Sequence, residues 1–152
     1  MLQRVQTIYF LLAFAATLCF LFLSLATIND ELVIYANEAL LNGKSLNTAH
    51  LPSWLYYILP LICVSFISFC ITKYKNRPLQ IKLCGASLLL STVLAVLNFI
   101  QLDKLRLHEM PEGTITYGVG SYLPVMAIAF LILGYRGVKK DEDLIRSVDR
   151  LR

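Results

Sequence analysis

Four cysteines, two histidines and one asparagine are the side chains in this sequence with the most scope for chemistry. Each cysteine lies inside or at the edge of an apolar stretch, with no Cys-x-x-Cys pair and no histidine nearby. In such surroundings a thiol is usually a small apolar packing residue, and neither a disulfide staple nor a metal or haem centre is predicted. We therefore expect no cofactor. The cysteines are Cys19, Cys63, Cys70 and Cys84.

The two histidines, His50 and His108, lie in different polar segments, and Glu109 and Glu112 follow the second. An enzyme site built from His50, His108 and Glu109 is one alternative, but lone histidines without a helical or hairpin spacing are weak evidence for a ligand set. The sequence shows no nucleophile with a base, no paired carboxylates and no phosphate-binding glycine loop. We therefore expect a protein without catalytic residues or a metal site.

Asn98 is the most deeply placed strongly polar residue of the long apolar stretches, whose middles lack Asp, Glu, Lys, Arg and His. Transporters and pumps carry such groups at membrane depth, where ions and protons are handled. Asn98 is instead expected to make a hydrogen bond between helices. The alternative is a small transporter or lipid-handling protein with a cavity near Asn98, opened by kinks at Pro60 and Pro124.

The composition indicates which elements hold these side chains. Of 152 residues, 57% are hydrophobic and 16% are charged, whereas soluble domains have about 45–50% and about 25%. A soluble fold of this length could not bury so much apolar surface, so a membrane protein is predicted. The net charge of +4 is too small and too spread along the chain to favour nucleic-acid binding.

Four apolar segments have the length that a spanning helix needs, roughly 20 residues. They predict a transmembrane four-helix bundle with spans at about 5–28, 53–72, 83–102 and 119–135. The first is longer than the apolar part of a signal peptide and lacks a clear cleavage pattern, so we expect it to be retained. With four crossings, eleven of the 14 basic residues fall on the side of the two chain ends, which predicts that both termini are cytoplasmic.

The two outer segments, 29–52 and 103–118, contain strand-forming patterns. Residues 32–35 read LVIY, and Asn42-Gly43 is a typical two-residue hairpin turn. Ile115 and Tyr117 alternate with threonines, as in a half-buried strand. Because lone hairpins are marginal in water, we expect both segments to pair into one small β-cap on the extracytoplasmic side. The alternative is two separate irregular loops.

Residues 138–152 form a charged tail after a transmembrane domain of residues 1–137. Its apolar positions fall on one side of a short amphipathic helix, which is too short to be stable alone in water. It must therefore lie on the membrane surface or dock on a partner. The predicted partner-binding residues are Leu144, Ile145, Arg146, Val148, Asp149, Arg150, Leu151 and Arg152.

The start of the chain, MLQRVQTIYFLLA, and its end, KKDEDLIRSVDRLR, resemble a bacterial family of four-span inner-membrane proteins, domain-of-unknown-function family 4293. The similarity covers the start, the fourth apolar segment and the tail well, and the outer loops poorly. The resemblance implies location in the bacterial inner (cytoplasmic) membrane. It implies no established activity, cofactor or substrate, and no catalytic residue is carried over.

Together these features predict a non-enzymatic accessory or assembly subunit of the bacterial inner membrane. Its expected partners are the lipid bilayer and either another membrane protein or further copies of the same chain. The cytoplasmic tail is expected to provide the docking face, and no nucleic acid is expected to bind.

Overall fold

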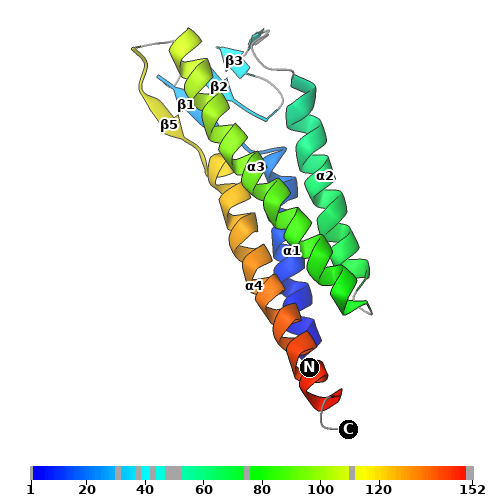
Figure 1. The fold of residues 1–152 in the computed structure, drawn as a ribbon. Coiled ribbons are helices and arrows are strands. Elements are labelled where there is room, and N and C mark those ends of the chain that lie inside the picture. Colours follow the sequence, from blue (N-terminus) through cyan, green and yellow to red (C-terminus); the bar gives the residue numbers. More distant parts are fainter. Residues whose placement is uncertain are drawn as a thin grey trace.

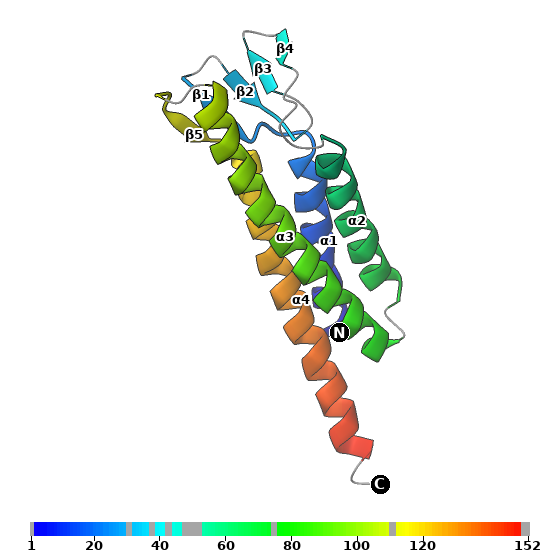
Figure 2. The ribbon, with the colours of Figure 1, turned by 45° about the horizontal axis from the view of Figure 1, so that its top comes forward.

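The computed structural model describes residues 2–29, 32–36, 39–41, 44–46, 53–73, 76–109 and 112–149. Within them the protein is mainly helical with a small antiparallel sheet, which confirms this part of the predicted fold class. Figures 1 and 2 show the helices running lengthwise beside one another, with the sheet at one end and both termini at the other. The helices are α1 (Leu2–Phe20), α2 (Ser53–Thr72), α3 (Arg77–Glu109) and α4 (Val119–Asp149).

The predicted helix over 5–28 is wrong beyond Phe20, where α1 ends. The chain then turns, with the Leu23 amide donating to the Cys19 carbonyl at 3.0 Å, and residues 26–28 form strand β1. Thr27 and Ile28 are β-branched, which favours a strand, and strands on both sides satisfy their backbone groups. Apolar character alone did not distinguish this strand from a last helical turn.

The other helices follow the predicted segments more closely. Helix α2 has the predicted bounds, 53–72, whereas α3 extends beyond 83–102 at both ends. Helix α4 begins at Val119 and continues through residue 137 into the tail without a break. Both Pro60 and Pro124 lie inside helices, as expected where neighbouring helices can compensate for the missing amide.

Both outer segments contribute to one sheet, as predicted. All strand pairs are antiparallel, and the order is β4-β3-β2-β1-β5. Leu41 pairs with Lys44, a register that requires a two-residue connection, although Asn42 and Gly43 themselves lie outside the described residues. The strands are β1 (Ala26–Ile28), β2 (Leu32–Ile34), β3 (Ala39–Leu41), β4 (Lys44–Leu46) and β5 (Ile115–Tyr117).

The buried core has one apolar cluster near the sheet and another toward the chain ends. In the first, Ile28 and Leu32 from neighbouring strands are fully buried with Phe20 of α1, so the inward side chains of the sheet close the end of the bundle. In the second, Phe10 of α1 packs with residues of the other three helices, including Leu131 of α4.

Helix α3 buries several polar or small side chains beside apolar ones such as Leu94 and Leu102, and it exposes several large apolar residues. Its buried positions include Gln80, Cys84, Ser87, Ser91 and Asn98, and its exposed positions include Leu79, Leu89, Val93, Val96 and Ile100. An amphipathic helix in water places its apolar stripe in the core. The arrangement seen here is expected where the surroundings are lipid and polar groups pair between helices.

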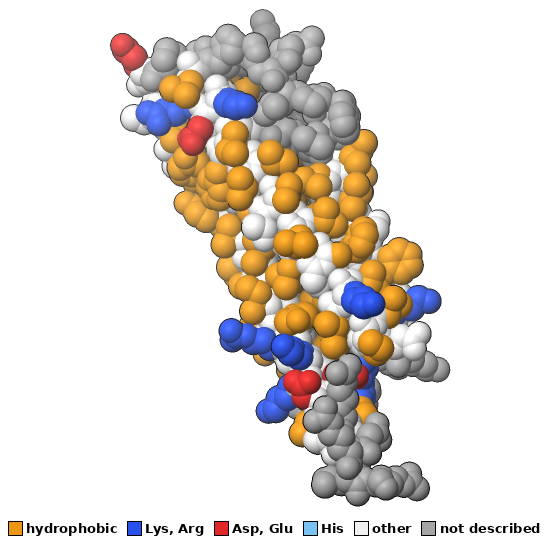
Figure 3. All heavy atoms as spheres, viewed as in Figure 1, with side chains coloured by type: hydrophobic (Ala, Val, Ile, Leu, Met, Phe, Trp, Pro, Cys, Tyr) orange, Lys and Arg blue, Asp and Glu red, His pale blue; other side chains and the backbone are white. Residues whose placement is uncertain are grey.

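Among the described residues, two helices are long and apolar enough to cross a membrane, α3 over Arg77–Leu107 and α4 over Val119–Ile145. Helices α1 and α2 carry shorter apolar stretches, Val5–Phe20 and Ile58–Thr72. Figure 3 shows apolar side chains covering the middle of the visible face, with Lys and Arg side chains gathered below them and a few charged side chains above.

Candidate functional site in the α4 extension

The first and last helices pack closely at the end of the bundle where the termini lie. A Cβ atom on Gly134 of α4 would lie 2.7 Å from Cε1 of Phe10, and one on Gly137 would lie 2.8 Å from Cγ of Gln6. Both glycines therefore let the backbone of α4 approach α1. Val138, on the same side of α4, is buried. This close packing against α1 holds α4 in place where α4 leaves the apolar part of the bundle.

A hydrogen bond joins α1 to the part of α4 formed by residues 136–149, here called the α4 extension. Nε2 of Gln6 donates to Oδ2 of Asp141 at 2.7 Å, and the Gln6 side chain is buried. Beyond Asp141, Leu144 is 52% exposed and Ile145 is 42% exposed. The first half of the α4 extension is thus attached to the bundle, through Val138 and Asp141, and the part beyond Asp141 presents apolar side chains.

Replacement of Gln6 by Leu is expected to lower the free energy of unfolding by about 1.5–2 kcal/mol, because it removes a hydrogen bond to a charged acceptor. Asp141→Asn keeps a carbonyl oxygen that can accept the same bond, so its effect is expected to be smaller. Thermal unfolding in mild detergent measures both. An equal loss for the two variants would contradict a role for this bond.

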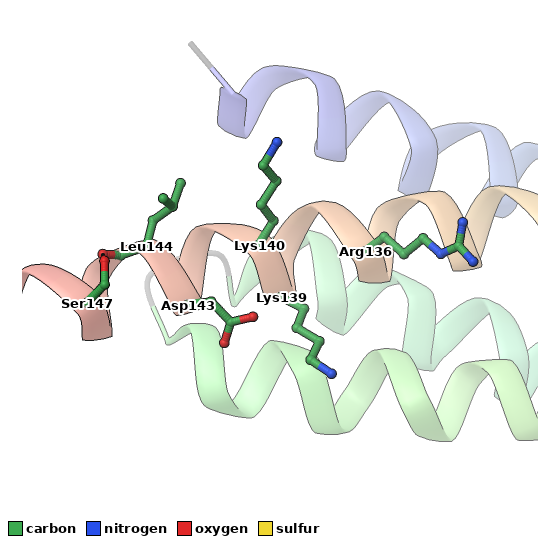
Figure 4. A pocket seen from close by; sticks show the side chains of 6 residues that line it. All are labelled: Arg136, Lys139, Lys140, Asp143, Leu144 and Ser147. Atoms are coloured by element: carbon green, nitrogen blue, oxygen red, sulfur yellow. Dashed lines mark hydrogen bonds between the residues drawn. The ribbon is translucent and has the colours of Figure 1, made fainter.

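The α4 extension carries an open groove of about 450 Å³. Figure 4 shows that its side chains project in different directions: Lys139 and Asp143 on one side of the helix, Lys140 and Leu144 on the other. Ser147 donates from Oγ to the carbonyl of Leu144 at 2.7 Å. The groups do not converge on one point as catalytic groups would, and the surface is a mixed basic and apolar helix face. It is lined by Arg136, Lys139, Lys140, Asp143, Leu144 and Ser147.

Two of the predicted docking residues, Leu144 and Ile145, are exposed on this helix. Three more belong to α4, but their side chains lie outside the described part, and the last three residues lie outside it altogether. These are Arg146, Val148 and Asp149, followed by Arg150, Leu151 and Arg152. The α4 extension continues the axis of the rest of α4 (Figures 1 and 2), and it therefore projects from the end of the bundle.

The other candidate residues are placed as follows. Cys63, Cys70 and Cys84 are buried, and the Cys84 thiol donates to the Leu131 carbonyl at 3.7 Å, which fits a packing role. His50 lies outside the described residues, and the side chains of His108 and Glu109 are likewise not described. Within the described residues, no group of three or more His, Cys, Asp or Glu could hold a metal ion.

Asn98 makes the predicted hydrogen bond between helices. Its side chain is 1% exposed, and Nδ2 donates to the carbonyl of Ser121 in α4 at 3.4 Å. Ser121 in turn donates from Oγ to the carbonyl of Leu25. Asn98 thus connects α3 to the start of α4 and, through Ser121, to the segment that follows α1.

A second polar group lies further along α3, next to the sheet. The hydroxyl of Tyr117 donates to Oδ1 of Asp103 at 3.4 Å, and its ring packs edge-on against Phe99 with centroids 5.7 Å apart. Burial raises the pKa of Tyr117, the nearby Asp103 charge raises it further, and Arg106 lowers it. The phenol therefore remains protonated and can donate to Asp103 at neutral pH. No local sequence pattern predicted this contact between α3 and β5.

A family model described as a domain of unknown function, DUF4293, matches residues 2–151. The chain belongs to this family. No curated protein and no solved structure matches the chain. The DUF4293 match covers the α4 extension together with the four helices and the sheet. The extension is therefore part of the family's common unit, and not a segment added to it.

Proposed function

We propose that this DUF4293 protein is a four-span protein of the bacterial inner membrane with both termini in the cytoplasm. In this proposal it is a non-enzymatic accessory or assembly subunit, and it docks a partner through the α4 extension. The observation that carries the proposal is the apolar outer surface of a bundle whose interior holds polar side chains. The projecting extension with exposed apolar residues adds the docking role.

The apolar surface is shared by all four helices. Exposed large apolar residues include Leu11 of α1, Leu61 of α2, Leu89 of α3 and Met126 of α4. Contiguous exposed apolar patches of more than a few hundred Å² mark membrane or protein contacts. At 1.5 Å per residue, the 19 residues of α1 and the 20 of α2 extend about 28 and about 30 Å, close to the thickness of a hydrocarbon core.

The charges favour one orientation. The end of the bundle away from the sheet carries the basic residues of the connection between α2 and α3 and of the α4 extension, and Figure 3 shows basic side chains gathered at that end. Basic residues in short loops concentrate on the cytoplasmic side. This distribution supports an orientation with the termini in the cytoplasm and the sheet outside. The basic residues include Lys73, Arg77, Lys82, Arg136, Lys139 and Lys140.

The docking role follows from how the α4 extension is held. Asp141 accepts a hydrogen bond from Gln6 of α1, whereas Leu144 and Ile145 lie further along the helix and remain exposed. Covering the exposed apolar residues of a helix face is favourable by about 25 cal/mol per Å² of apolar surface removed from water. A helix of another membrane subunit, or of a second copy, would supply such cover in the aqueous layer next to the membrane.

The test is a crosslinking pull-down of the full chain from native membranes. Substitution of both Leu144 and Ile145 by Glu is expected to remove the specific crosslinked partner while leaving the folded protein intact, because both side chains are exposed. This double variant keeps Asp141 and its hydrogen bond, which deletion of residues 141–152 would remove. Thr116→Glu, at an exposed position of the sheet, is the control for added charge. An unchanged partner set would contradict the docking role.

A further inference from the structure

The outward side of the contact between α3 and α4, near the sheet, forms an apolar surface that we call the α3–α4 seam. It consists of Val96 and Ile100 on α3 and Tyr122 and Met126 on α4, each about half exposed. The rings of Phe99 and Tyr122 meet edge-on across the two helices, with centroids 6.4 Å apart. Figures 1 and 2 show the two helices side by side along this length.

Charged groups lie where the seam reaches the sheet. Asp103 is exposed and follows Phe99 by one helical turn, and its carboxylate accepts the hydroxyl of Tyr117. Arg106 lies a turn further and donates from Nε to the carbonyl of Gly113 at 3.1 Å. That bond uses one of the five N–H donors of the guanidinium. An acid, a base and two tyrosines therefore border the same end of the apolar seam.

We propose that the α3–α4 seam binds one phospholipid of the outer leaflet whose headgroup carries a primary amine and a phosphate, such as phosphatidylethanolamine. An acyl chain lies along the seam, the phosphate meets Arg106, and the ethanolamine arm turns back along α3 so that its ammonium group meets Asp103 and the tyrosines. The inference rests on the four-span arrangement proposed above, but it is independent of docking by the α4 extension.

The chemistry of the site favours a zwitterion with N–H donors. A carboxylate next to aromatic rings attracts an ammonium group through charge-assisted hydrogen bonding and cation–π attraction. A guanidinium binds phosphate oxygens through parallel N–H donors. Asp103 and Arg106 together carry no net charge, so they match a zwitterionic headgroup. A phosphatidylglycerol headgroup would satisfy Arg106 but leave Asp103 facing no cation, and choline offers no N–H to the carboxylate.

The experiment counts bound lipids by native mass spectrometry on the purified full chain in detergent. The probes are phosphatidylethanolamine, phosphatidylcholine and phosphatidylglycerol with identical acyl chains. We expect the wild type to bind the ethanolamine lipid most tightly, and Asp103→Asn to weaken that binding by roughly tenfold, the effect of losing one charge-assisted hydrogen bond. Asp103→Glu is expected to retain the preference. Lys104→Gln, at the neighbouring exposed residue, is the control and is expected to change nothing.

Two results would overturn the lipid site: equal binding of the three lipids by the wild type, or equal effects of Asp103→Asn and Lys104→Gln. Thermal unfolding of each variant shows whether a loss of binding comes from loss of the fold. Alkaline carbonate extraction of the wild type separates this proposal from the one on which it rests. A chain released from the membrane contradicts the four-span arrangement, whereas a retained chain without lipid preference contradicts the seam site alone.

Discussion

Gly120→Ala is expected to lower the free energy of unfolding by about 2 kcal/mol, within the range for added atoms in a tightly packed site. A Cβ at this position would lie 2.5 Å from the Ser24 carbonyl oxygen and 3.0 Å from that of Leu23. Both obstacles are backbone atoms, so no side-chain rotation relieves the clash. The Gly120 amide also donates to the Ser24 carbonyl at 3.1 Å, and displacement of α4 would weaken that bond.

Gly85→Ala is the matched control for this substitution. Gly85 lies inside α3, and a Cβ there would meet no atom within 4 Å. Because glycine in a helix interior is less stable than alanine by roughly 0.5–1 kcal/mol, this variant is expected to gain stability. Unfolding of both variants by denaturant titration in mixed micelles should give shifts of opposite sign. A gain in stability for both variants would show that the close contact at Gly120 does not limit stability.

Leu89→Arg is expected to impair the protein strongly, although Leu89 is 72% exposed. An exposed substitution on a water-soluble protein usually changes stability by no more than about 0.5 kcal/mol. An arginine at the centre of a spanning helix costs roughly 2.5–3.5 kcal/mol on insertion scales. We therefore expect a clear fall in the fraction of the chain that inserts and remains folded in the membrane, measured by protease protection and yield.

Leu107→Arg is the control, because Leu107 is 68% exposed on the same helix but lies beyond Asp103, at the level of the sheet. There the arginine meets water and headgroups, so little effect is expected. If the two arginines behaved alike and both were tolerated, the surface around Leu89 would face water, and the four-span arrangement would be wrong.

Local patterns predicted those elements whose signals lie within a few residues. The bounds of α2 and the shared sheet of both outer segments followed from apolar length and from alternation around Ile115. The end of α1 did not, because residues 26–28 are as apolar as a helix end. Their strand state depends on partners such as Thr116, which is far away in sequence and pairs with Thr27.

The same distinction holds for the candidate site. The apolar spacing of Leu144 and Ile145 predicted that they lie on a helix, and both are helical and exposed. The hydrogen bond between Gln6 and Asp141 joins residues 135 positions apart, and no periodicity reports such a pair. The continuity of α4 was missed because a change from apolar to charged residues marks the end of a span without ending the helix.

The position of β1 sets an order of events for making this protein. Strand β1 follows α1 directly, yet it pairs on one side with β5, and α1 packs against α4, the last helix. During synthesis the side-chain amide of Gln6 can bond to Asp141 only after Asp141 has been made. In the same way, the Leu25 carbonyl has no Gly118 amide to accept from until the chain has reached Gly118. Long-range contacts of this kind slow folding. The first helix therefore completes its contacts only when nearly the whole chain has left the ribosome, and an interrupted chain would leave it without its main neighbour.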